Sequence, residues 1–234
     1  MARGDTRPFD PASVPALAGC ADATRSALAA AEPATFAPGA RLWTLGAAAP
    51  LVVLVKGAIK LERPPVVVDV ARGPALACDV GFADEAPATT DAIALRASIA
   101  IVLTRADARR LRDPALDAAA RAAVYALHRA FARRVDATVR GDVDKRLVAV
   151  IVELAERFGA SVGGGLFVAL PLRRRDLAAM VGATPETASR VLARLEEAGL
   201  VRARREGLWV AASVLRPGLR EHGRRNRNAE RERE

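Results

Sequence analysis

Residues 173–200 read Arg-Arg-Arg-Asp-Leu-Ala-Ala-Met-Val-Gly-Ala-Thr-Pro-Glu-Thr-Ala-Ser-Arg-Val-Leu-Ala-Arg-Leu-Glu-Glu-Ala-Gly-Leu, and this stretch decides how the C-terminal part of the chain folds. Its first half has an apolar helical face, and Gly182 then supplies a tight turn. Thr184 followed by Pro185 is an N-cap with proline at the first helical position. A second apolar stripe follows at helical spacing until Gly199 stops the helix. The stretch therefore predicts a helix-turn-helix.

The residues after this motif predict a basic β-hairpin. Residues 200–210 form two short apolar-ended segments around Arg204-Arg205-Glu206-Gly207, which is typical of the wing of a winged helix. The second helix leaves Glu186, Ser189 and Arg190 on a polar face that can meet DNA base edges. We expect further contacts with the DNA backbone from Arg173, Arg174, Thr184, Thr187, Arg194, Arg204 and Arg205.

An ordinary helical hairpin with a solvated charged face would explain the same helices. The DNA interpretation is preferred because the caps, the turn, the second helix and the basic hairpin follow one another in the right order. For Glu186, the alternative is a first-turn acid that only stabilises the helix dipole.

Composition and charge agree with a DNA-binding module at the C-terminus. The 234 residues carry a formal net charge of +9, and residues 171–234 contain 15 basic against 9 acidic residues. Only nine aromatic residues occur, which argues against a protein that binds single strands by stacking. We expect folded domains up to about residue 216 and a disordered charged tail over 217–234.

In the region before the helix-turn-helix, the hydrophobic pattern changes from short strand-like runs to helical periodicity. Residues 35–103 contain short apolar runs separated by Gly and Pro, which predict a β-sandwich or barrel. We place this sheet structure in a first domain of residues 1–113, which begins with a helix near 15–31. Residues 114–140 predict one long helix. The last domain, 141–216, begins with a further helix over 145–158, which a glycine turn at 163–165 follows. The fold class is therefore α+β.

The long helix carries an apolar stripe that must be covered. Pairing with the same helix of a second chain is the simplest solution, so we expect a homodimer. The stripe that we assign to this interface consists of Leu116, Ala120, Val124, Leu127, Phe131 and Val135.

The N-terminal residues and the two cysteines indicate the cellular compartment and the state of the thiols. Residues 1–8 lack the apolar core of a signal peptide and no run of 18 apolar residues occurs, so we expect a cytoplasmic protein without membrane contact. Cys20 and Cys78 match no zinc spacing and are interpreted first as buried, inert thiols.

The order of these segments resembles the Crp/Fnr superfamily of bacterial transcription regulators. Residues 176–196 follow its DNA-binding signature, and residues 36–43 and 55–61 are similar to the first strands of its cyclic-nucleotide-binding type β-roll. The resemblance implies a jelly-roll-like β-roll sensor domain, a dimerisation helix and a winged helix-turn-helix. It also implies double-stranded DNA, a second copy of the chain and RNA polymerase as partners.

The resemblance assigns roles to the second helix. Family members read the TGA part of a palindromic half-site with a Glu, a Ser or Gly three residues on, and the next Arg, which are Glu186, Ser189 and Arg190 here. The Glu-x-x-Ser-Arg form is similar to the Fnr branch, while Pro185 stands where the Crp branch usually has Arg.

The sensor region departs from the family's ligand-binding pattern. Cyclic-nucleotide binders carry a Gly-Glu pair and an Arg-Ser/Thr pair, whereas this chain has Cys78-Asp79 and Thr89-Thr90 and no Lys or Arg between Arg72 and Arg96. We therefore expect no cyclic nucleotide. An iron–sulfur cluster would need four cysteines, so it is not expected either. A haem on His128 and a thiol switch between the two cysteines stay open.

Two other functional classes compete with a ligand-controlled regulator. A cupin-like enzyme needs histidine ligands for a metal, yet residues 34–104 contain no histidine, so we expect neither an enzyme nor a metal site. A ligand-independent DNA-binding protein, whose sensor domain serves only as a dimerisation scaffold, is the stronger alternative.

Overall fold

The computed structural model describes residues 9–139 and 142–215, without the side chains of 137–139. These residues form two compact units, one made of residues 9–139 together with 179–182, and the other of residues 142–178 and 183–215. The predicted tail over 217–234 lies outside the described residues. Within the described ranges, no helix combines the length and apolar composition that crossing a bilayer requires.

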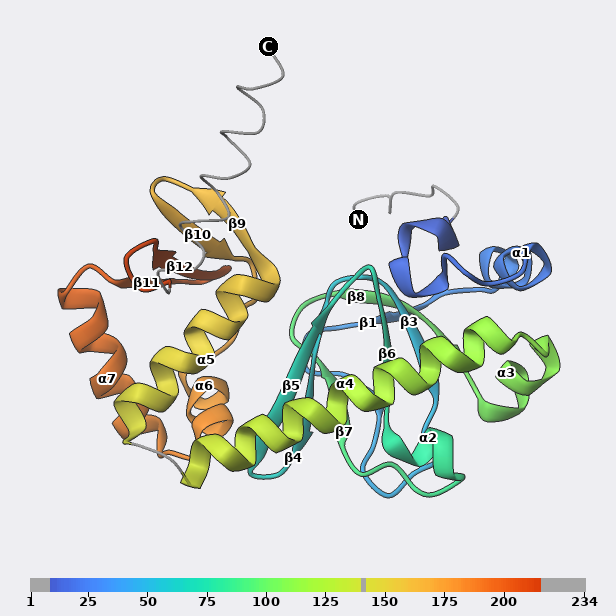
Figure 1. The fold of residues 1–234 in the computed structure, drawn as a ribbon, viewed down its shortest axis with the longest axis horizontal. Coiled ribbons are helices and arrows are strands. Elements are labelled where there is room, and N and C mark those ends of the chain that lie inside the picture. The colour runs from blue at the N-terminus through green and yellow to red at the C-terminus, as the bar shows by residue number, and fades with distance from the viewer. Residues whose placement is uncertain (1–8, 140–141, 216–234) are drawn as a thin grey trace, which may run out of the picture. The chain divides into compact units, whose positions relative to one another are not determined.

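The first unit is a two-sheet β domain with helices before and after it (Figure 1). Its helices are η1 (Pro11–Ser13), η2 (Pro15–Leu17), α1 (Asp22–Ala30), α2 (Val80–Asp84), α3 (Arg105–Leu111) and α4 (Pro114–Val139). Its strands are β1 (Ala34–Phe36), β2 (Arg41–Trp43), β3 (Leu51–Lys56), β4 (Ala58–Arg63), β5 (Val66–Arg72), β6 (Ala75–Cys78), β7 (Asp91–Ala94) and β8 (Ser98–Leu103). The N-terminal helix that we predicted near 15–31 is thus the 3-10 turn η2 followed by a shorter α1.

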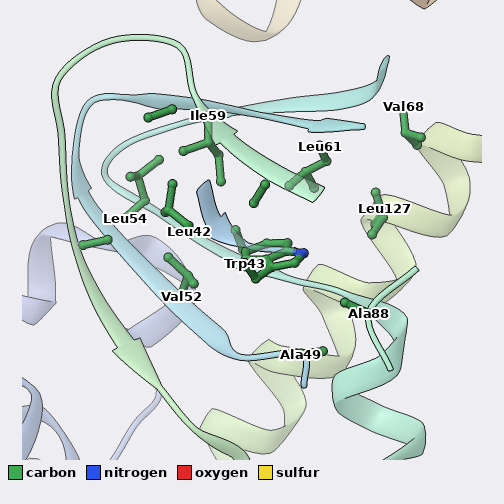
Figure 2. Close-up of a cluster of buried hydrophobic side chains, with 14 of the residues drawn as sticks. Leu42, Trp43, Ala49, Val52, Leu54, Ile59, Leu61, Val68, Ala88 and Leu127 are labelled. Atoms are coloured by element: carbon green, nitrogen blue, oxygen red, sulfur yellow. The ribbon is translucent and has the colours of Figure 1, made fainter. Parts of the chain in front are cut away.

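The strands form two antiparallel four-stranded sheets with the orders β1-β8-β3-β6 and β2-β7-β4-β5. Apolar side chains from both sheets meet between them, and Figure 2 shows Val52 and Leu54 of one sheet with Ile59 and Trp43 of the other. The two-sheet domain, the long helix and the C-terminal helical unit confirm the predicted fold class. Strand β6 and helix α2 had not been predicted, since both are short and lie between Gly and Pro residues.

Helix α4 has two different apolar faces. Leu116, Ala120 and Leu127 are buried in the cores of the β domain, and Leu127 lies beside Val68 and Ala88 in Figure 2. In the single chain these three side chains pack within the β domain, and the dimer interface that we expect from the stripe stays a prediction. Val124 is partly buried against the same core. Phe131 and Val135 are 44% and 48% exposed.

Asp113 caps the start of α4 and ties the N-terminal segment to it. Its carboxylate accepts hydrogen bonds from the amides of Ala115 and Ala21, both at 2.9 Å, and from the Thr24 hydroxyl. The Thr24 hydrogen bond, followed by those from the backbone amides, lowers the pKa of the Asp113 carboxyl against the opposing effect of desolvation. The residue is buried, so these bonds are shielded from water.

Replacing Asp113 with asparagine should lower the melting temperature at neutral pH and weaken its dependence on acid. Because the folded-state pKa is lowered, the carboxylate stabilises the fold above its ordinary pKa of about 4, and this contribution is lost as the pH falls through the folded-state pKa. Thermal melts between about pH 5 and pH 3 measure the effect. The exposed Asp117, replaced in the same way, is the control in the first turn of α4. Parallel melting curves for both variants would contradict the assignment.

The second unit is a winged helix-turn-helix. Its elements are α5 (Val143–Phe158), β9 (Gly159–Val162), β10 (Gly165–Val168), α6 (Arg174–Val181), α7 (Pro185–Glu197), β11 (Val201–Arg204) and β12 (Gly207–Ala211). The strands form one antiparallel sheet in the order β11-β12-β10-β9. The predicted glycine turn is the tip of the β9–β10 hairpin, where Gly163 and Gly164 adopt positive φ angles of 53° and 78°. The two strands beside this turn had not been predicted.

Candidate nucleic-acid interface

Helix α7 begins and ends where its capping residues require. The Thr184 hydroxyl accepts a hydrogen bond from the Thr187 amide at 3.2 Å, and Pro185 occupies the first helical position. Gly182 and Gly199 adopt left-handed conformations, with φ angles of 60° and 68°, on either side of the helix. These local features position the helix along the chain as the sequence predicted.

The packing of α7 defines which residues it presents outward. Ala188, Val191 and Leu192 are buried, with exposed fractions of 3% or less. Glu186 and Arg190 are exposed and Ser189 is partly exposed, away from this buried stripe. The Arg190 guanidinium donates a long 3.4 Å hydrogen bond to the Thr187 hydroxyl, one turn earlier. The structure therefore presents these three polar side chains together on the outer side of one helix.

Two other arginines near α7 take part in ion pairs. Arg194 donates to both carboxylate oxygens of Asp144 at the start of α5, at 2.9 and 2.6 Å. Arg174 lies 3.8 Å from Glu196, which also accepts a hydrogen bond from the Ala203 amide at 2.8 Å. Both arginines are more than half exposed, so these pairs contribute little to stability but restrict the two side chains. Among the predicted backbone contacts, Arg173 is exposed and its amide donates to Asp176.

The β11–β12 hairpin carries exposed arginines at its tip and along one strand. Arg204 and Arg205, which were predicted as backbone contacts, are exposed at the turn. Arg202 lies 5.1 Å above the Trp209 ring, and the Trp209 indole donates to the Val162 carbonyl at 2.9 Å. Arg202 was not among the predicted contacts, although its spacing of two from Arg204 places both on one side of a strand.

The residues considered for sensing lie in the first unit. Cys20 and Cys78 are buried in the same apolar cluster. Burial raises the pKa of the Cys78 thiol to about 12, and burial with the negative charge of Asp113 raises that of Cys20. Both groups are thus poor thiolates, which favours the interpretation of inert core thiols over a redox switch.

Thiol labelling tests this interpretation. In the native protein at about pH 8, we expect both cysteines to react with a disulfide reagent far more slowly than in the guanidinium-unfolded chain, because a raised pKa and burial suppress the thiolate. The release of the coloured thiol leaving group measures the rate. Labelling of either cysteine at the unfolded-chain rate would contradict the assignment and revive the thiol switch.

His128 lies at a cavity between α4 and the β domain. The cavity has a volume of about 200 Å³ and is lined by Arg63, Val68, Val80, Thr89, Thr90, Leu127, His128 and Phe131. His128 itself is exposed. Ligand pockets for drug-sized molecules measure about 300–1,000 Å³, so this cavity suits a smaller molecule.

Comparison with known proteins agrees with this architecture. Residues 145–212 match the family model of the Crp-like helix-turn-helix domain. Over 72 residues the chain is 33% identical to the CRP-like cAMP-activated global transcriptional regulator of Mycobacterium tuberculosis, which covers 31% of this chain and 32% of that protein. The chain thus matches about a third of the length of this curated relative.

Solved structures share the fold over most of the chain. FixK2 from Bradyrhizobium japonicum is 17% identical with a TM-score of 0.64, covering 77% of this chain and 92% of that one. The c-di-GMP responsive global regulator CLP from Xanthomonas campestris is 17% identical with a TM-score of 0.66, covering 81% and 98%. TTHB099, a CRP-family transcriptional regulator from Thermus thermophilus, is 18% identical with a TM-score of 0.62, covering 77% and 94%. These similarities concern the fold.

Proposed function

We propose that this chain, which carries a Crp-like helix-turn-helix domain on the fold of the CRP/FNR regulators, is a homodimeric transcription regulator that binds a palindromic DNA site. A function on DNA would place it in the cytoplasm and bring it to RNA polymerase. We propose no enzymatic reaction.

The outer face of α7 carries this proposal. Glu186 and Arg190 are exposed one turn apart on a helix whose opposite stripe is buried. The outer face can therefore enter the major groove while the buried stripe stays packed against the rest of the domain. An arginine donates to guanine O6 and N7, and a carboxylate accepts from cytosine N4. These chemistries suit a half-site that contains TGA.

A second copy of the chain would pair through the outer face of α4. Val124, Phe131 and Val135 recur at helical spacing beside the face that packs on the β domain, and Phe131 and Val135 are 44% and 48% exposed. A two-fold pair of α4 helices would present two α7 helices to DNA about 34 Å apart, which is one helical turn.

A small effector would occupy the cavity between α4 and the β domain. Arg63 at the end of β4 lines this cavity and supplies a positive charge from outside the segment between Arg72 and Arg96. Thr89 and Thr90 also line it, but their hydroxyls already donate to the Asp79 carboxylate. We therefore keep the proposal that the ligand is not a cyclic nucleotide.

Selection of binding sites from random duplex DNA tests the proposal with the full-length protein. We expect enrichment of a two-fold palindrome with TGA in each half and spacing of about one helical turn. Enrichment of an unpaired half-site would refute the dimeric part, and a pool without any enriched sequence would refute sequence-specific binding.

The wing arginines should act differently from the residues of α7. Replacing Arg204 or Arg205 with alanine should weaken binding to all sequences alike and reduce the dependence of affinity on salt, because each side chain is expected to neutralise a phosphate. Titrations at several salt concentrations, on the selected site and on a scrambled duplex, measure both effects. A wing variant with an altered sequence preference would contradict this role.

A further inference from the structure

The Asp79 carboxylate is completely buried between the end of β6 and the start of α2, with an exposed fraction of 0%. It accepts hydrogen bonds from the amides of Gly81 at 3.0 Å and Thr89 at 2.8 Å. The hydroxyl of Thr90 donates to it at 2.6 Å, and that of Thr89 lies 3.2 and 3.1 Å from its two oxygens. One buried carboxylate therefore gathers four donor groups.

These donors come from two segments that the carboxylate holds together. Gly81 lies in α2, whereas Thr89 and Thr90 precede β7. The backbone between them folds tightly: a Cβ atom on Gly81 would lie 2.5 Å from the Pro87 carbonyl oxygen, and the Ala86 amide donates to the Gly81 carbonyl. Gly81 thus lets the chain close around the carboxylate.

The donors that surround Asp79 are neutral. Two amides and two hydroxyls converge on the space of one carboxylate, and such a convergence of neutral dipoles is how proteins hold an anionic group. Without an anion, the buried donors of Gly81 and Thr90 and the partly buried donors of Thr89 would lose their partner, which is costly. The cradle formed by Gly81, Thr89 and Thr90 therefore requires a negative charge to be stable.

We propose that Asp79 is a built-in anion that fills this cradle. Its carboxylate holds α2 and the segment before β7 together, so these segments need no anionic ligand to adopt this arrangement. Helix α2 packs against α4, and Thr89 and Thr90 line the cavity that Leu127 and His128 of α4 also line. The carboxylate thus holds in place Thr89 and Thr90, which a ligand in the cavity would contact together with residues of α4. Because the threonine hydroxyls donate to the Asp79 carboxylate, they are not free to donate to a ligand at this end of the cavity.

Chemical rescue of Asp79→Ala tests the proposal in the full-length protein and does not depend on DNA binding. The variant removes a carboxylate and leaves space for formate. We expect its melting temperature to fall by about 5 °C or more, since several buried donors lose a charged partner. Sodium formate should restore much of this loss, while formamide, a neutral molecule of similar shape, should not. The wild-type protein should respond to neither beyond the effect of sodium chloride at equal ionic strength.

Two further variants keep the test decisive. Adding Thr89→Ala and Thr90→Ala to Asp79→Ala removes both hydroxyl donors and should weaken the rescue by formate. Asp79→Asn keeps the size of the side chain without its charge, so it should also melt below the wild type even if Asp79→Ala does not fold. A melting temperature of Asp79→Asn equal to that of the wild type, or equal rescue of Asp79→Ala by formate, formamide and chloride, would overturn the proposal.

Discussion

Replacing Arg190 with alanine should lower the affinity for the selected DNA site by about 5- to 150-fold, or about 1–3 kcal/mol, and remove the preference for guanine in TGA. The helix that carries Arg190 is fixed by the Thr184 cap and by the buried Val191 and Leu192, so the loss should concern the contact and not the fold. Repeating the site selection with the variant measures the preference directly.

Arg194 offers a matched control on the same helix. It lies one turn after Arg190 and is held by Asp144, so its replacement with alanine should change affinity less and change all sequences alike. Glu186→Ala should instead relax the preference for the cytosine paired with the guanine. If Arg190→Ala selects the wild-type sequence, or Arg194→Ala selects a different one, the roles proposed for α7 are wrong.

Replacing Phe131 and Val135 together with glutamate should convert the protein into monomers and reduce the affinity for the palindrome by about 100-fold or more. Two linked binding modules gain this much from avidity, and like charges on paired helices repel. Because both side chains are 44% and 48% exposed in the single chain, the monomeric variant should still fold. Sedimentation equilibrium and titration of a full palindrome against a single half-site measure the two effects.

Leu127→Ala is the control for the other face of α4. The side chain is 5% exposed within the β-domain core, so its truncation should destabilise the fold by about 2–5 kcal/mol and leave the dimer contact in place. A Phe131 and Val135 double variant that remains dimeric would show that the chains pair elsewhere or do not pair through α4.

The sequence by itself determined the features that depend on neighbouring residues. Thr184, Pro185 and Gly199 set the start and end of α7, and Arg204–Gly207 set the turn of the wing, because caps and turns act over a few residues. The long helix and the strand-rich segment before it followed from hydrophobic periodicity. These local rules were enough to predict the fold class and to select the outward side chains of α7.

Only the tertiary structure decided how distant residues share the available contacts. The apolar stripe on α4 has one helical period, but Leu116 and Leu127 pack inward while Phe131 and Val135 stay exposed. Periodicity alone does not say which part of a wide stripe another element covers. Arg194 was expected at DNA phosphate and is paired with Asp144, 50 residues away. In the sequence Asp79 only stood where cyclic-nucleotide binders carry a Glu, and in the structure it fills a cradle whose donors Thr89 and Thr90 lie ten and eleven residues away. Such non-local contacts depend on how separate segments pack together, which no short window of sequence contains.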